Sequence, residues 1–201
     1  MNIKLYIQWG DMLPNGKILW HRKRLAKCFV RGFMQHIEAL ANHSYGALGT
    51  SVSIMDTAGA NQTVRAAAAG IYFASYYFSS VALAADATYG IVVGTGNAAV
   101  TTSDHALQTP IAHGNAAGQL LYSAVTIVGT VTVPASNTLQ VVRTFTNSSG
   151  GDITVNEVAW YCSSMEFGGA QKFFCLTRDL QTQLIVNGGS KIAVLSLVTT
   201  L

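Results

Sequence analysis

Charged residues are scarce in this chain. Asp, Glu, Lys and Arg make up 10% of its 201 residues, against about 25% in an ordinary soluble domain. Because the cores of protein interfaces are depleted in charge, copies of the same chain could cover such a surface. The composition is therefore compatible with an assembly subunit. It is equally compatible with a monomer whose polar surface consists of Ser, Thr, Asn and Gln.

Cysteine is also scarce. The chain has three, Cys28, Cys162 and Cys175. The number is odd and the spacing matches no metal-binding motif, so we expect neither a disulfide framework nor a metal site. The pattern predicts free thiols in a reducing compartment, with a buried apolar role for each.

A signal-peptide layout and a long apolar run are missing as well. Lys4, Gln8 and Asp11 interrupt the N-terminal segment. The charge-free run at residues 66–85 is broken by three serines and five aromatic residues, which disfavours a membrane span. We therefore expect no membrane partner.

Residues arranged for catalysis are not evident. No two carboxylates are placed by sequence for acid–base work, and His105 and His113 lack the spacing of a zinc pair. Ser103 and Asp104 precede His105 directly, but a catalytic triad requires convergence in space rather than adjacency. We therefore expect no enzymatic activity, no catalytic residue and no metal.

Gly94, Gly96 and Ala99 approximate a nucleotide-binding fingerprint. That motif requires the glycines to open a helix facing the pyrophosphate. Residues 100–104 form a poor helix, and no acidic residue follows at the ribose-binding distance. The pattern therefore favours a turn between strands, and we expect no cofactor.

Short β-branched segments alternate with Gly, Asn, Ser and Asp clusters along most of the chain. The turn signals at 147–152 and 186–190 are the strongest. The pattern predicts a mainly β fold, an antiparallel β-sandwich of jelly-roll type with about eight strands over residues 49–201. The strands are expected at residues 51–55, 71–78, 89–94, 119–128, 138–146, 153–161, 172–178 and 192–199.

Before this domain we expect an N-terminal arm, residues 1–48, with a helix at about 20–42. Apolar residues recur there at helical spacing. Residues 1–31 carry a net charge of about +6 and the rest about −3. The basic face is a candidate contact for nucleic acid or an acidic partner; a solvated charged face is the alternative. Its residues are Arg22, Lys23, Arg24, Lys27 and Arg31.

Aromatic residues provide a second set of candidates. An exposed aromatic run on a monomer would be an aggregation hazard, so we expect these residues in the core or between subunits. The candidate subunit interface consists of Phe29, Phe33, Tyr72, Phe73, Tyr76, Tyr77 and Phe78. Tyr72, Tyr76 and Tyr77 could instead form an exposed platform for a glycan. Arg143 and Arg178 lie on expected strands, where we predict pairing across strands or an interface.

Five segments together resemble small β-rich structural proteins of tailed bacteriophages: residues 89–96, 104–114, 118–122, 143–147 and 151–158. The resemblance implies a structural protein of the virion, assembled in the host cytoplasm and present in several symmetric copies. Its place would be the neck, collar or tail. A capsid-associated (decoration or minor capsid) protein and a receptor- or glycan-binding tail-fibre module are the alternatives. The implied partners are copies of itself, other virion proteins and packaged DNA.

Overall fold

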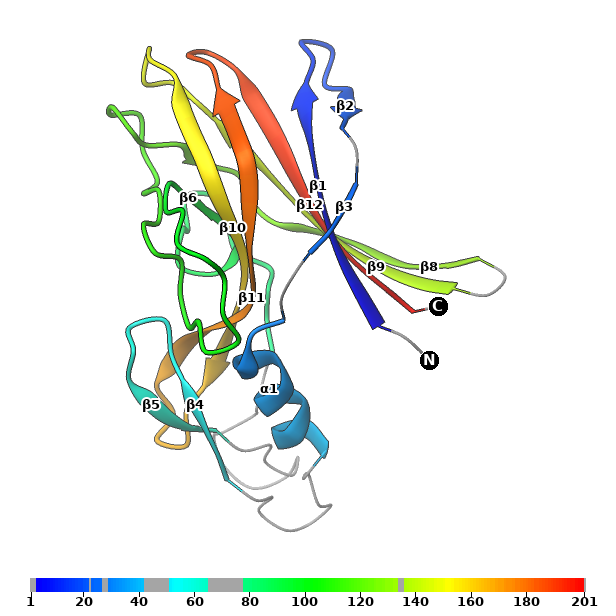
Figure 1. The fold of residues 1–201 in the computed structure, drawn as a ribbon, viewed down its shortest axis with the longest axis vertical. Coiled ribbons are helices and arrows are strands. Elements are labelled where there is room, and N and C mark those ends of the chain that lie inside the picture. Colours follow the sequence, from blue (N-terminus) through cyan, green and yellow to red (C-terminus); the bar gives the residue numbers. More distant parts are fainter. Residues whose placement is uncertain are drawn as a thin grey trace.

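The computed structural model describes residues 3–21, 23–26, 29–41, 51–64, 78–133 and 136–200. This part of the chain is mainly β, with antiparallel sheets and a helix in the N-terminal region (Figure 1). The strands are β1 (Ile3–Met12), β2 (Ile18–Trp20), β3 (Arg24–Leu25), β4 (Val52–Met55), β5 (Asn61–Val64), β6 (Gly90–Gly94), β7 (Leu121–Tyr122), β8 (Thr126–Val133), β9 (Ser136–Thr146), β10 (Ile153–Met165), β11 (Gln171–Val186) and β12 (Lys191–Thr200). The helix is α1 (Arg31–Ala41).

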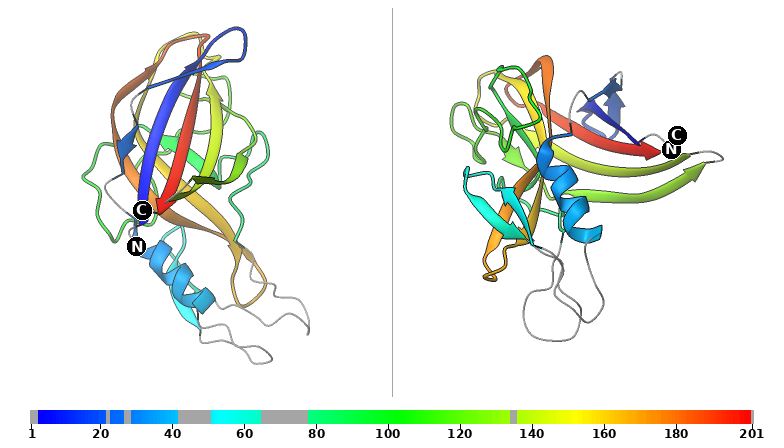
Figure 2. Two further views of the ribbon diagram at one scale, coloured as in Figure 1. Left: turned by 90° about the vertical axis from the view of Figure 1, so that its right-hand side faces the viewer. Right: turned by 60° about the horizontal axis from the view of Figure 1, so that its bottom comes forward.

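The largest sheet joins the two ends of the chain. Its strands follow the order β2-β1-β12-β9-β7, with β3 also on β1 and β8 also on β9. Strands β1 and β12 are antiparallel, with Ile3 opposite Thr200. The chain ends therefore lie side by side, as both Figure 1 and Figure 2 show.

The second sheet has the order β11-β10-β6 and carries the most buried strands. Strand β6 is buried at each of its five residues, and β10 is buried at every residue from Glu157 to Ser164. Two irregularities in the β10–β11 register, after Val155 and after Trp160, bend this ribbon. Buried residues from both sheets, including Val93 and Phe145, belong to a single apolar cluster.

Helix α1 and the β4–β5 hairpin lie beside the lower half of β11 in Figure 1. The segment that leads into the helix is tied to this strand, because the Val30 N–H donates to the Leu176 carbonyl and Phe29 bridges Thr177. The hairpin is tied to it as well, through the Thr57 N–H and the Phe173 carbonyl. The helix is therefore placed by backbone pairing as well as by packing.

The predicted helix at 20–42 is wrong in its first half. Residues 18–20 and 24–25 are strands that pair with β1, and the helix begins only at Arg31. The backbone of the earlier segment is satisfied by a sheet edge instead of by helical bonds, which sequence periodicity cannot reveal. The predicted apolar stripe is only partly buried, since Ile37 and Leu40 are each 44% exposed.

The N-terminal segment does not leave the body as a free arm. Strand β1 lies between β12 and the short strands β2 and β3, and its Leu5 and Ile7 are each 2% exposed. The predicted boundary at residue 48 falls in a stretch outside the described residues and stays a prediction.

The expected strands at 51–55, 89–94, 138–146, 153–161, 172–178 and 192–199 are confirmed by β4, β6, β9, β10, β11 and β12. The expected strand at 119–128 is two strands, β7 and β8, separated by residues 123–125. Of the expected strand at 71–78, residues 71–77 lie outside the described residues. Over residues 49–201 the described residues form nine strands, β4 to β12, where about eight were expected. The division of 119–128 and the unexpected β5 add two strands, and the expected strand at 71–78 is not among those described. None of its helices has the length and apolar character needed to cross a membrane.

The burial of β1 predicts the effect of truncating one of its side chains. Ile7→Ala should lower the free energy of unfolding by about 2–5 kcal/mol, because it leaves a cavity in the core. Leu25→Ala on the neighbouring strand, 56% exposed, is the control and should change it by less than about 0.5 kcal/mol. Urea unfolding of both variants measures the difference; equal effects would mean that β1 does not contribute to the core.

Candidate functional site

A buried ion pair joins the two long strands of the second sheet. Glu157 lies on β10 and Arg178 on β11. The Arg178 Nε donates to Glu157 Oε2 at 2.8 Å, and Nη2 of the same guanidinium is also 2.8 Å from that oxygen. The side chains are 0% and 3% exposed. Burying two charges is costly unless further hydrogen bonds satisfy both groups.

The Glu157 carboxylate obtains those bonds from the loop at residues 95–109. It accepts backbone N–H groups of Gly96 at 3.2 Å, Gln108 at 3.1 Å and Thr109 at 2.8 Å. The donors lie at both ends of the loop, more than 45 residues before Glu157 in the chain. One side chain therefore holds both ends of a loop that has no regular secondary structure against the sheet.

Gly94 and Gly96 make this approach possible. A Cβ atom at Gly94 would lie 2.6 Å from Glu157 Oε1, and one at Gly96 would lie 2.5 Å from it. Any other residue type would displace the carboxylate. No helix follows these glycines, so the nucleotide-binding fingerprint is not formed; they lead from β6 into a loop between strands instead of a tight turn.

Arg178 also holds the middle of the loop. Its Nη1 donates to Asp104 Oδ2 at 2.8 Å, and its Nη2 donates to the Ala98 carbonyl at 3.1 Å. Asp104 accepts further bonds from the N–H and hydroxyl of Thr101. The prediction that Arg178 pairs across strands is confirmed, with Glu157 as its partner.

The direction of the pKa shifts of Asp104 and Arg178 follows from this geometry. Burial raises the pKa of Asp104, but the hydrogen bonds from Thr101 and Arg178 outweigh burial and hold it below its ordinary value of 3.8. Burial disfavours the charge on Arg178, but the Asp104 and Glu157 carboxylates outweigh burial and raise the pKa of the guanidinium. Asp104 and Arg178 are therefore both charged at neutral pH.

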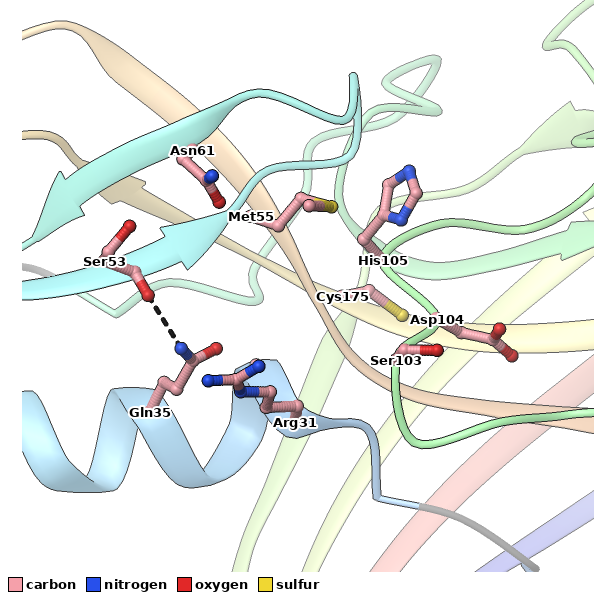
Figure 3. Close-up of a pocket in the computed structure, with 10 residues that line it drawn as sticks. Arg31, Gln35, Ser53, Met55, Asn61, Ser103, Asp104, His105 and Cys175 are labelled. Carbon is pink, nitrogen blue, oxygen red and sulfur yellow. Dashed lines mark hydrogen bonds between the residues drawn. The ribbon is translucent and has the colours of Figure 1, made fainter.

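Ser103, Asp104 and His105 do not form a catalytic constellation. The Asp104 carboxylate is occupied by Thr101 and Arg178, and the Ser103 hydroxyl is paired with the Thr101 hydroxyl at 3.0 Å. Figure 3 shows the His105 ring and the Asp104 carboxylate pointing in different directions. His113 lies elsewhere, where its Nδ1 accepts the Tyr122 N–H at 3.1 Å.

Two hollows flank the loop that carries Asp104. One, of about 360 Å³, lies between the start of α1, the β4–β5 hairpin and β11, and is drawn in Figure 3. Its polar wall includes Arg31, Gln35, Asn61 and His105, and Gln35 donates to the Ser53 carbonyl at 2.7 Å. The other, of about 370 Å³, lies on the Arg178 side of the loop. Neither brings together two free acid–base groups.

Arg143 forms a second buried hub, on the seven-stranded sheet. It is 1% exposed, and its guanidinium stacks over the Tyr122 ring at 4.8 Å. Burial lowers the pKa of Arg143, and hydrogen bonds to backbone carbonyl oxygens replace those that water would make to the guanidinium. The guanidinium donates to the carbonyls of Ser123, Tyr89, Ile91, Leu83 and Asp86. The predicted pairing of Arg143 is therefore with backbone carbonyls of the segment at residues 83–91 and with Ser123, rather than with an acidic residue.

A histidine and a cysteine meet in the core beneath α1. His36 Nδ1 donates to the Gly32 carbonyl at 2.7 Å, and its Nε2 lies 3.6 Å from the Cys162 thiol. Burial lowers the pKa of His36 despite that backbone bond, and burial raises the pKa of Cys162. The imidazole is therefore neutral and the thiol protonated at neutral pH, so this pair is structural. Cys162 and Cys175 are buried and neither is in a disulfide, as predicted, whereas Cys28 lies outside the described residues.

The five basic candidates do not share one helix face. Lys23 precedes β3 and its ammonium lies 4.4 Å from the centre of the Tyr6 ring, Arg24 lies on β3, and Arg31 begins α1 at an exposed position. Arg22 and Lys27 lie outside the described residues.

The aromatic candidates are divided in a similar way. Phe29 and Phe33 contact each other with ring centres 4.4 Å apart, and Phe78 is 39% exposed beside His36. Tyr72, Phe73, Tyr76 and Tyr77 lie outside the described residues, so their part in an interface stays a prediction.

Sequence reasoning missed the role of Glu157. A lone carboxylate in an apolar strand was a signal, since such a group is rarely buried without a cationic partner. Its loop donors were not predictable, because they are far away in sequence. Among the described residues, no group of three or more His, Cys, Asp or Glu side chains could hold a metal ion. Comparison of the chain with protein-family models, curated proteins and solved structures found no match.

The buried pair predicts a large effect for a small change. Glu157→Gln keeps the shape but leaves Arg178 without its buried counter-charge and turns amide hydrogens toward the loop N–H groups. The free energy of unfolding should fall by about 3–5 kcal/mol. Glu38→Gln, at an exposed position of α1, is the matched control and should change it by less than about 0.5 kcal/mol. Urea unfolding that gives the same result for both variants would contradict a stabilising role for the pair.

Proposed function

We propose that this chain is a virion structural protein of a tailed bacteriophage, present in several symmetric copies in the neck, collar or tail. It would assemble in the host cytoplasm, contact copies of itself and other virion proteins, and act without catalysis. The resemblance of its strand and turn segments to such proteins suggests this role. The distribution of charge supports it independently.

The observation that carries the proposal is that a charge-poor chain buries several of its charges. Asp56, Arg143, Glu157, Arg178 and Asp179 are at most 4% exposed, in a chain with only 12 basic and 9 acidic residues. Residues 114–142 contain no charged side chain at all. Large apolar side chains such as Leu83 (72%) and Met34 (61%) remain exposed. Contacts with neighbouring subunits would cover such a surface.

For the architecture, we further propose a β-sandwich of jelly-roll type in which the seven-stranded and three-stranded sheets face each other. Its strands come from residues 49–201 and, in the seven-stranded sheet, also from β1, β2 and β3. The single apolar cluster formed by residues of both sheets supports this arrangement. A body of this kind, with one long strand edge available at β8, is suited to repeated contacts in a ring or shell.

Contact with packaged DNA is a further part of the proposal. Lys23 and Arg31 are exposed, and the segment that carries them is the most basic part of the chain. Exposed cations of this kind bind phosphate groups without sequence preference.

Locating the protein in purified particles tests the virion assignment. Quantitative mass spectrometry should find it at a fixed ratio to the other virion proteins, and antibody labelling should mark the junction of head and tail or the tail itself. A cytoplasmic host protein, quantified in the same preparation, controls for contamination. Labelling over the head would favour the capsid-associated alternative, and a protein absent from the particles would refute the proposal.

Charge reversal tests DNA contact. In Lys23→Glu/Arg31→Glu, the slope of log binding constant against log salt should fall by about 2, because two phosphate contacts are lost. Fluorescence anisotropy with a DNA duplex measures it. The matched control is Lys4→Glu/Lys17→Glu, which changes the net charge equally on β1 and in the β1–β2 turn. If both double variants lose the same amount, the residues make no specific contact and net charge alone explains the binding.

A further inference from the structure

The two edges of the seven-stranded sheet are treated differently. On one side, β1 is covered by the short strands that follow it: Gly10–Met12 pair with β2, and Tyr6 and Ile7 pair with β3. The Leu5 carbonyl also accepts the Ala26 N–H. The chain therefore folds back on itself and satisfies much of this edge.

The other side ends in the two-residue β7, which pairs with β9, and in the longer strand β8. This strand pairs with β9 from Thr126 to Val133, and within the described part of the chain it has no second strand partner. In an antiparallel pair, alternate residues direct their N–H and C=O groups away from the partner. Strand β8 thus presents a row of backbone donors and acceptors. Figures 1 and 2 show the β8–β9 hairpin projecting from the body on the side of the chain ends.

The devices that usually protect an edge strand are few here. Natural edges carry charged side chains, proline or bulges, or are very short. Strand β8 has eight residues, none of them charged and none a proline. Its consecutive residues Ile127 and Val128 are 43% and 44% exposed, so both faces of the strand are accessible there. A register irregularity between Val128 and Thr130 interrupts the ladder but leaves β-paired residues on both sides of it.

We propose that β8 is an assembly edge that pairs antiparallel with β8 of a second copy of this chain. The identity of the partner follows from the chemistry of the β8 edge. Without a cation it offers nothing to a phosphate backbone or an anionic surface, and without any charge it meets its own copy without repulsion. The opposite side of the sheet offers as its outer edge only the short strands β2 and β3, of three and two residues. The edge that matches the length of β8 is therefore β8 of a second copy, placed about a two-fold axis.

This contact rests on the multi-copy assembly proposed above and identifies one of its interfaces. It joins two seven-stranded sheets into one continuous sheet across the axis. Backbone bonds supply the affinity, and Ile127 and Val128 lose exposed apolar surface in the contact.

Substitution of an exposed apolar residue of β8 by lysine tests the proposal. The wild-type chain should form dimers or larger even-numbered oligomers in sedimentation velocity. Ile127→Lys and Val128→Lys should each weaken self-association about 100-fold or more, because the two-fold axis brings two copies of the cation onto the same short, uncharged edge. Both positions are exposed, so circular dichroism and the unfolding midpoint should stay unchanged. Ile185→Lys, on β11 at a position 54% exposed, is the matched control and should associate like the wild type.

Mixing charges identifies the partner as a second copy. Val128→Glu should be monomeric alone, as Val128→Lys is, and an equimolar mixture of the two should recover the oligomer. A wild-type chain that stays monomeric, or edge variants that lose association no more than Ile185→Lys does, would overturn the proposal. In the second case the chain still assembles, so the proposed function would stand while this interface fails.

Discussion

The buried pair of Glu157 and Arg178 is the interaction on which the rest of the structure depends. Two charges removed from water on adjacent strands require nearly complete hydrogen bonding. Glu157 obtains it from backbone N–H groups at both ends of the loop at 95–109, and Arg178 obtains it from Asp104 and the Ala98 carbonyl in between. The course of the loop, the two glycines that admit the carboxylate and the hollows on either side of the loop all follow from this requirement.

Arg143 is a second buried charge, on the seven-stranded sheet, and it too is satisfied by backbone groups of an irregular segment. Its guanidinium binds five backbone carbonyls, four of them in the segment at residues 83–91 that leads into and begins β6. Irregular segments are thus held by buried charges instead of by regular hydrogen bonding. One consequence is a surface even poorer in charge than the composition suggests, on which backbone edges and apolar side chains remain for contact with neighbours. The burial of charges that holds the irregular segments therefore also leaves the uncharged surface on which the proposed assembly depends.

Much of the sheet structure could be predicted from the sequence, and the candidate site could not. Alternation and turn residues located β6, β9, β10 and β12, because these signals are local. The helix prediction failed at Trp20 and at Arg24–Leu25, where pairing with β1 satisfied the backbone of a segment with helical periodicity. The role of Glu157 depends on donors 48 to 61 residues away, so it could be established only in three dimensions. The adjacency of Asp104 and His105 in the sequence carried no catalytic prediction, and the two side chains point in different directions (Figure 3).

Amide hydrogen exchange tests the central role of the buried pair most directly. If Glu157 and Arg178 hold the loop, the amides of Gly96, Gln108 and Thr109 should exchange as slowly as those of the neighbouring strand β10, although they lie outside regular secondary structure. Protection of these three amides together is the predicted result. Exchange at the rate of freely exposed loop amides would show that the loop opens independently of the pair, and would contradict the account.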